Sequence, residues 1–198
     1  MLEPHKIKEI SKKYADRNIK FRTFLKSRAD SDELDQQFRD LHNEIFIRDG
    51  YDCSKCANCC KLYDIRVEKN DISAIAEYLG QTESDFTKKF LVQDKEEAGV
   101  FYIKDKPCGF LNIDGKCLIY GVRPLVCKDF PYTKKPDRLF NLIGIMGFAE
   151  DCPVVFEIIE RLKRMNPQIH NAGWLEPATL TSFNRKRTLS QRKEDHLR

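Results

Sequence analysis

Cys53-Ser54-Lys55-Cys56-Ala57-Asn58-Cys59-Cys60 places four thiols within eight residues. The whole chain has 8 Cys in 198 residues. An even spread would therefore place roughly 0.3 Cys in such a window. Thiols separated by two residues can turn from one tight loop onto a single soft metal, which is why this spacing recurs in zinc and iron–sulfur sites. The stretch predicts chelation.

Four further cysteines follow far along the chain. Because 47 residues separate Cys60 from Cys108, the chain must fold back to bring the later thiols to the first cluster. If these thiols are ligands too, the metal lies at the centre of the fold. The sequence predicts metal ligation by all eight: Cys53, Cys56, Cys59, Cys60, Cys108, Cys117, Cys127 and Cys152.

Composition predicts a cytoplasmic protein. Charged residues make up 33% and hydrophobic residues 41% of the chain, which is typical of a soluble protein with a modest core. Residues 1–6 lead into a charged segment without the apolar stretch of a secretory signal. The longest nearly apolar run, 139–149, is too short to cross a bilayer, so we expect no membrane partner. Cytoplasmic thiols stay reduced, which favours metal binding or catalysis over disulfides.

The first 50 residues predict an antiparallel helical hairpin. Apolar residues recur at steps of three and four over residues 3–28 and again from Leu34 to Ile45, with Ser31 or Asp32 as the cap of the second helix. Residues 1–28 carry a net charge of +6 and residues 29–49 a net charge of −5, and opposite charges beside an apolar seam favour antiparallel docking. This hairpin is the surface that an unknown protein partner could bind.

Short strands and helices are predicted to follow the first cluster. The expected order is a strand at 63–67, a helix from a cap at Asn70 or Asp71 to Gly80, a helix from Thr82, and a strand at 100–104. Two turns of a loop-rich hairpin then carry Cys108 and Cys117.

The segment Arg123-Pro124-Leu125-Val126-Cys127 predicts a short helix. Pro124 suits the first helical turn, since its missing N–H would be unpaired there in any case. Cys127 would then be held at the end of that turn. The apolar residues 139–149 contain Gly144 and Gly147 and predict a strand followed by a turn.

A last helix is predicted from Pro153 to the residues before Pro167, with Glu157–Arg161 and Glu160–Arg164 pairs. Together these elements predict a helix-rich α+β fold. Its expected parts are the helical hairpin at 1–50, a Cys-rich, metal-organised domain with short strands at 51–165, and a mobile basic tail at 166–198. No aromatic residue or RNA-binding motif interleaves with the charges of 184–198, so nucleic acid is not expected as a partner.

Eight thiolates are too many for one tetrahedral ion. Two zinc ions could share them, or one four-iron cluster could take four and leave four for another metal, for packing or for chemistry. The run Cys53-x2-Cys56-x2-Cys59 matches the first three ligands of a bacterial ferredoxin run and favours an iron–sulfur (4Fe–4S) cluster, with zinc as the alternative. Consecutive side chains diverge, so one of Cys59 and Cys60 is expected to serve a second site or to lie beside the metal without binding it. Basic residues beside the thiols could offset their negative charge: Lys55, Lys61, Arg123 and Lys128.

The chain resembles the YkgJ-like CxxCxxCC family of zinc- or iron-chelating domains. The resemblance rests on C-x2-C-x2-C-C at 53–60, Pro107-Cys108, Cys117-Leu118-Ile119-Tyr120, Arg123-Pro124-x2-Cys127 and Phe130-Pro131. It covers about residues 51–131, and Cys152 is expected to belong to it as well. The Cys-rich part is also similar to that of bacterial flagellin lysine N-methylases, a resemblance that implies an iron–sulfur cluster and S-adenosylmethionine.

Three functions follow as hypotheses. The first is a cytosolic metal-binding protein with a Cys-ligated cluster in a redox or cluster-assisted oxidoreductase role. The second is a zinc-stabilised interaction module without enzymatic activity, because a structural zinc site can contribute on the order of 10 kcal/mol to folding. The third is methyl transfer to a protein lysine. The sequence identifies no catalytic residue.

Overall fold

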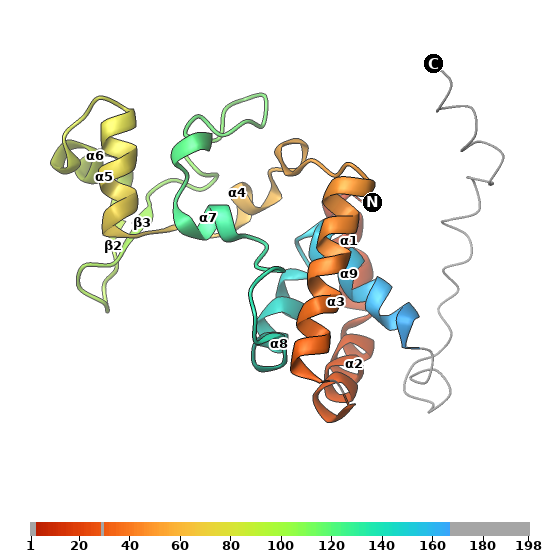
Figure 1. Ribbon diagram of the computed structural model, residues 1–198. Coiled ribbons are helices and arrows are strands. Elements are labelled where there is room, and N and C mark those ends of the chain that lie inside the picture. Colours follow the sequence, from red (N-terminus) through yellow and green to blue (C-terminus); the bar gives the residue numbers. More distant parts are fainter. Residues whose placement is uncertain (1–2, 29, 167–198) are drawn as a thin grey trace, which may run out of the picture.

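The computed structural model describes residues 3–28 and 30–166. It is helix-rich with a small antiparallel sheet, which confirms the predicted α+β class (Figure 1). The α-helices are α1 Pro4–Lys13, α2 Ala15–Arg28, α3 Ser31–Asn43, α4 Asn58–Leu62, α5 Lys69–Tyr78, α6 Glu83–Phe90, α7 Leu125–Asp129, α8 Arg138–Phe148 and α9 Pro153–Met165. The strands are β1 Arg66–Val67, β2 Leu91–Gln93 and β3 Phe101–Ile103. A π-helical turn occupies Glu44–Arg48, and 3-10 turns occupy Cys53–Lys55 and Tyr120–Val122.

The N-terminal segment forms helices where the apolar spacing predicts them, with one break. The expected helix over 3–28 is divided at Tyr14, which lies between α1 and α2. The cap of α3 is Asp30, one residue before the predicted positions, and its carboxylate accepts hydrogen bonds from the N–H groups of Asp32 and Glu33. The π-helical turn then extends α3 toward Gly50, whose φ of +65° suits glycine at this reversal.

The apolar faces of α2 and α3 share one buried cluster with α8 and α9. Phe21 of α2, Phe38 of α3 and Ile158 of α9 are fully buried members of it. Helix α8 packs against α2 and α3, and α9 packs against α1, α3 and α8. The core that the N-terminal hairpin was predicted to form is therefore completed by two helices from the other end of the described chain.

Residues 138–148 form helix α8, so the predicted strand and turn in this segment is wrong. Asp35 of α3 supplies a distant cap, because its carboxylate accepts hydrogen bonds from the N–H groups of Asp137 at 2.8 Å and Arg138 at 2.9 Å. Leu142, Ile145 and Met146 follow helical spacing into the core. A Cβ placed on Gly144 or Gly147 would have no neighbour within 4 Å, so both glycines lie on the open side of the helix.

A second buried cluster lies around the sheet. The strand order is β1-β3-β2, antiparallel throughout, with Val67 opposite Phe101 and Leu91 opposite Ile103. Strand β2 was not predicted. Helix α6 has the predicted Thr82 cap. The cap of α5 is Glu68, so the predicted cap at Asn70 or Asp71 is wrong; the N–H of Glu68 donates to Asp71 in a capping box. Ile75, Phe86 and Phe110 belong to this cluster.

The two clusters share no residue within the described part of the chain. We call residues 4–48 with 138–165 the helical lobe and residues 65–119 the sheet lobe. In Figure 1, α4 and α7 lie between the two lobes. The domain division at residues 50 and 165 stays a prediction. Of the tail predicted at 166–198, residues 167–198 lie outside the described residues.

Helix α9 carries two ion-pair systems. The predicted pair of Arg161 with Glu157 is confirmed at 2.8 Å. Glu160, however, pairs with Lys163 at 2.6 Å and not with Arg164, and both members of that pair are almost fully buried. Arg164 instead contacts Glu157 at 3.3 Å.

Across residues 3–28 and 30–166, the helices are too short or too polar to span a bilayer.

Candidate metal centre

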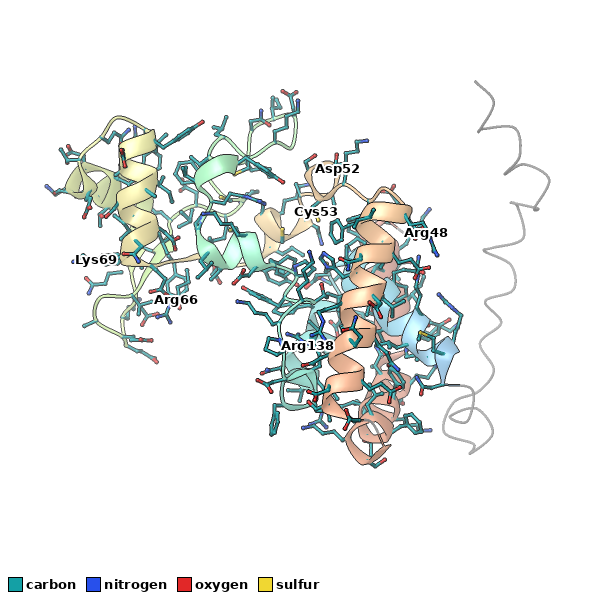
Figure 2. The ribbon with its side chains drawn as sticks, viewed as in Figure 1. Arg48, Asp52, Cys53, Arg66, Lys69 and Arg138 are labelled. Atoms are coloured by element: carbon teal, nitrogen blue, oxygen red, sulfur yellow. The ribbon has the colours of Figure 1, made fainter. Side chains whose placement is uncertain are left out.

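The first cysteine cluster is a compact turn leading into a short helix. Asp52 caps the turn by accepting a hydrogen bond from Ser54 N–H at 2.9 Å, and the carbonyl oxygen of Cys53 accepts from the N–H groups of Cys56 and Ala57 at 3.1 and 3.0 Å. Ala57 then adopts a left-handed conformation with φ of +49°, which reverses the chain into α4. Figure 2 shows Asp52 and Cys53 in the segment between the two lobes.

Backbone contacts bring two of the distant thiols to this cluster. Cys108 N–H donates to the carbonyl oxygen of Cys60 at 2.8 Å. Cys117 pairs with Leu111 in an isolated antiparallel bridge, which closes the predicted loop-rich hairpin. At the tip of that hairpin, a Cβ on Gly115 would lie only 3.6 Å from the carbonyl oxygen of Ser54. The hairpin that carries Cys108 and Cys117 therefore lies directly against the first cluster.

Cys127 is held by the predicted short helix. Helix α7 begins after Pro124, and Cys127 N–H donates to the carbonyl oxygen of Pro124 at 2.9 Å. The first N–H of the helix, that of Leu125, donates to the Asp71 carboxylate at 3.1 Å. Asp71 belongs to α5, so the sheet lobe fixes the start of the helix that presents Cys127.

Cys152 approaches from the helical lobe. It is 7% exposed, belongs to the buried cluster of that lobe and occupies the cap position of α9. The N–H groups of Val154 and Val155 are directed at its sulfur. The residue before it is tied to α4, because Asn58 Nδ2 donates to the carbonyl oxygen of Asp151 at 2.7 Å. Tyr63 donates its hydroxyl to the Asp151 carboxylate at 3.3 Å.

The eight thiols fall into groups that interact electrostatically. One group consists of Cys60, Cys108, Cys117 and Cys127, in which each pair of thiols interacts. A second mutual group consists of Cys53, Cys56 and Cys152, and Cys53 also interacts with Cys60 of the first group. Cys59 lies next to the first group, with its Sγ 4.0 Å from that of Cys60.

Without an ion, the thiols of Cys60, Cys127 and Cys152 hold their protons strongly. Burial, with repulsion from neighbouring thiols, raises the pKa of Cys127 to about 12 and that of Cys152 to about 12. A hydrogen bond with Cys59, followed by burial, raises the pKa of Cys60. Metal binding at these thiols therefore releases protons to solvent.

Arg123 acts electrostatically on both groups of thiols. Its charge lowers the pKa of Cys53 and Cys60, and of Cys117 and Cys127, against the larger effects that raise them. Its Nε donates to the carbonyl oxygen of Tyr120 at 3.1 Å, and its guanidinium lies 3.8 Å from the centre of the Tyr120 ring. From the sequence alone, Arg123 was one of four basic residues that could offset the charge of the thiols, and the other three were lysines.

A cavity of about 420 Å³ lies beside the thiols. Six of the predicted ligands line it, namely Cys53, Cys59, Cys60, Cys108, Cys117 and Cys127. Much of its remaining wall is aromatic, from Tyr63, Phe110, Phe130, Tyr132 and Phe148. Phe130 packs edge-on against Phe148 and Tyr132, with centroids 5.4 and 5.7 Å apart. Sequence reasoning missed this aromatic wall, for which Phe130-Pro131 was the one available signal.

The chemical type of these ligands suits a thiophilic metal, since all eight thiols are free of disulfides. Within residues 3–28 and 30–166, however, no three His, Cys, Asp or Glu side chains already stand in an arrangement that could hold an ion. His42 contacts Thr133 at 2.6 Å and the Phe46 ring. His5 is exposed, and the other two histidines, at 170 and 196, lie outside the described residues.

The fold and the thiols define a cysteine-rich, metal-chelating class of protein, and comparison with known proteins agrees. The family model described as "CxxCxxCC: Putative zinc- or iron-chelating domain" matches residues 52–153. The chain belongs to this family, which confirms the resemblance seen in the sequence and supports metal binding. The matched range also includes Cys152, beyond the motifs that carried the resemblance.

One relative is "Uncharacterized protein MJ0661" of Methanocaldococcus jannaschii, which is 34% identical over 85 residues. The aligned part makes up 42% of this chain and 46% of that protein, so the match spans less than half of the relative. No solved structure matches the chain.

Proposed function

We propose that this protein carries a Cys-ligated iron–sulfur cluster and serves a redox or cluster-assisted oxidoreductase role. The observation that carries the proposal is the cavity lined by six thiols and an aromatic wall. A structural zinc site is closed on all sides by its ligands, whereas a reactive metal centre keeps one side open. The cavity supplies such a side.

The surrounding residues suit this role. When bound, an iron–sulfur cluster would supply one-electron transfer or substrate activation at the cavity. Arg123 would offset the negative charge of the thiolates. The N–H groups directed at sulfur, from Phe110 and Leu111 at Cys108 and from Ile119 at Cys117, would stabilise the thiolate form. The aromatic wall would limit the access of water.

Reduced thiols also need a reducing compartment, so we propose the cytoplasm as the place of action.

Anaerobic purification tests this function. The protein should be brown, with a broad absorption band near roughly 400 nm, and should contain iron together with acid-labile sulfide. Colourless protein with stoichiometric zinc, which takes up no cluster from added iron and sulfide, would overturn the redox proposal.

A second candidate function is a zinc-stabilised interaction module. It is favoured by the position of the thiols between two separate buried clusters, where bound ions would join the lobes. Structural zinc contributes folding free energy directly. The partner would then be a protein that binds the helical lobe, and the discriminating result is zinc in place of iron in freshly isolated protein. Methyl transfer stays a hypothesis that rests on resemblance alone.

A further inference from the structure

We propose that the eight thiols form two separate four-thiolate sites, one joined to each lobe. The sheet-lobe site consists of Cys60, Cys108, Cys117 and Cys127, and the helical-lobe site consists of Cys53, Cys56, Cys59 and Cys152. This inference rests on metal binding, the coarser part of the proposed function, and does not depend on whether the metal is zinc or iron.

The sheet-lobe set is held together by contacts to the sheet lobe. The side chains of Cys108, Cys117 and Cys127 pack against the buried cluster around the sheet. Cys60 joins them because its carbonyl oxygen accepts the hydrogen bond from Cys108 N–H. The start of α7, and with it Cys127, is fixed by Asp71 of the same lobe.

The helical-lobe set is anchored on the other cluster. Cys152 is buried in it, and Tyr51 packs against it beside Cys56. The tight turn at 53–57 keeps Cys53 and Cys56 together. The bond from Asn58 to Asp151 joins this turn to Cys152.

Cys59 completes the second set. A tetrahedral ion with bonds of about 2.3 Å has ligand sulfurs about 3.8 Å apart, so the 4.0 Å between Cys59 and Cys60 would also suit a single ion. The assignment therefore rests on the partners of each thiol. Cys60 already belongs to a complete set of four. Tyr63 links Cys59 to the other set, because its N–H donates to the carbonyl oxygen of Cys59 at 3.1 Å and its hydroxyl donates to the carboxylate of Asp151, the neighbour of Cys152, at 3.3 Å. Consecutive positions on α4 also project about 100° apart around the helix axis.

Zinc titration of metal-free protein under anaerobic conditions, read by native mass spectrometry, tests the division. The wild-type chain should bind about two zinc ions, and Cys117→Ser and Cys152→Ser should each retain about one. The double variant should retain none. Ser27→Ala, at an exposed position whose hydroxyl bonds only within α2, serves as the control and should bind as the wild type does. A single variant that loses both ions, or a wild-type chain that binds one, would overturn the division.

Alkylation of the wild-type protein gives a second test that needs no variant. With rising chelator, the thiols should lose protection in two groups of four that match the two sets. Loss of protection by all eight at once, or in differently composed groups, argues against the division. The readout also separates this inference from the function: two zinc sites without cluster uptake would leave the division standing and remove the redox role. A chain that binds neither metal would remove both.

Discussion

Asn58 of α4 and Asp151, the residue before Cys152, are joined by a hydrogen bond of 2.7 Å between the side-chain amide and the backbone oxygen. They are 93 residues apart in sequence. This bond connects the first cysteine cluster to the one predicted ligand buried in the helical lobe. The arrangement of the thiols is therefore maintained by polar contacts around them.

Replacing Asn58 should weaken metal retention at Cys152. Asn58→Ala removes a partly buried hydrogen bond, with an expected cost of about 1 kcal/mol in the free energy of unfolding. Competition with a chromogenic chelator should show about fivefold easier loss of zinc. Tyr63→Phe, which removes the longer 3.3 Å bond to the same residue, is the matched control and should have a smaller effect. Equal zinc retention by wild type and Asn58→Ala would contradict the role assigned to this bond.

Asp71 should affect both stability and the Cys127 site. Its carboxylate accepts hydrogen bonds from Glu68 N–H and Leu125 N–H. Asp71→Ala leaves both donors without their partner, so we expect a loss of about 1–3 kcal/mol in urea unfolding together with faster zinc release. Thr82→Ala removes the cap of α6, far from any thiol in sequence, and should cost about 1 kcal/mol with zinc release unchanged. Similar zinc release from both variants would show that Asp71 acts through stability alone.

The buried pair of Lys163 and Glu160 should respond differently to single and double substitution. Lys163 also donates to Asn18 at 2.5 Å, and burial lowers its pKa. Lys163→Met leaves Glu160 buried without its partner, so urea unfolding should show a loss of about 3–5 kcal/mol. The double variant Lys163→Met/Glu160→Leu should recover most of that loss, because buried ion pairs are often replaceable by apolar residues. A double variant as unstable as the single one would rule out this explanation.

His42 should make stability depend on pH. Burial, together with the charge of Lys134, lowers its pKa from 6.5 to about 4. Between these values the unfolded chain binds a proton that the folded chain does not, so stability rises with pH across that window and is complete above about 6.5. The ring is half-buried, and after allowance for solvent screening we expect on the order of 1 kcal/mol.

Urea unfolding of wild type and His42→Gln at pH 7 and pH 4.5 measures this effect. Taking the difference between the two proteins cancels the pH dependence of stability that comes from the carboxylates and thiols that they share. The wild-type advantage should be smaller at the lower pH. An advantage that is the same at both values would mean that His42 is protonated in the fold.

Local signals predicted much of the fold. Thr82 capped α6 as expected, Pro124 preceded the helix of Cys127, and the turn residues before Cys117 closed a hairpin. Each of these depends on a few neighbouring residues, whose conformational preferences are visible in the sequence. Cysteine spacing predicted that distant thiols come together for the same reason, because metal ligation restricts the residue types and their separations.

Features decided by distant contacts were not predictable in the same way. Helix α8 was misread because Gly144 and Gly147 weaken helix propensity, while its cap comes from Asp35, roughly a hundred residues earlier. The aromatic wall of the cavity combines Tyr63 with Phe148, which no local pattern connects. The grouping of the thiols likewise depends on which lobe each one packs against.

The separation of the two buried clusters has a thermodynamic consequence. Each lobe has its own apolar core, so in the metal-free chain we expect the two lobes to unfold independently. Scanning calorimetry of that chain should resolve two transitions, and saturation with zinc should merge them at a higher temperature. Cooperative unfolding of the whole molecule would then depend on the bound ions, because coordination bonds would connect two lobes that no continuous apolar core joins.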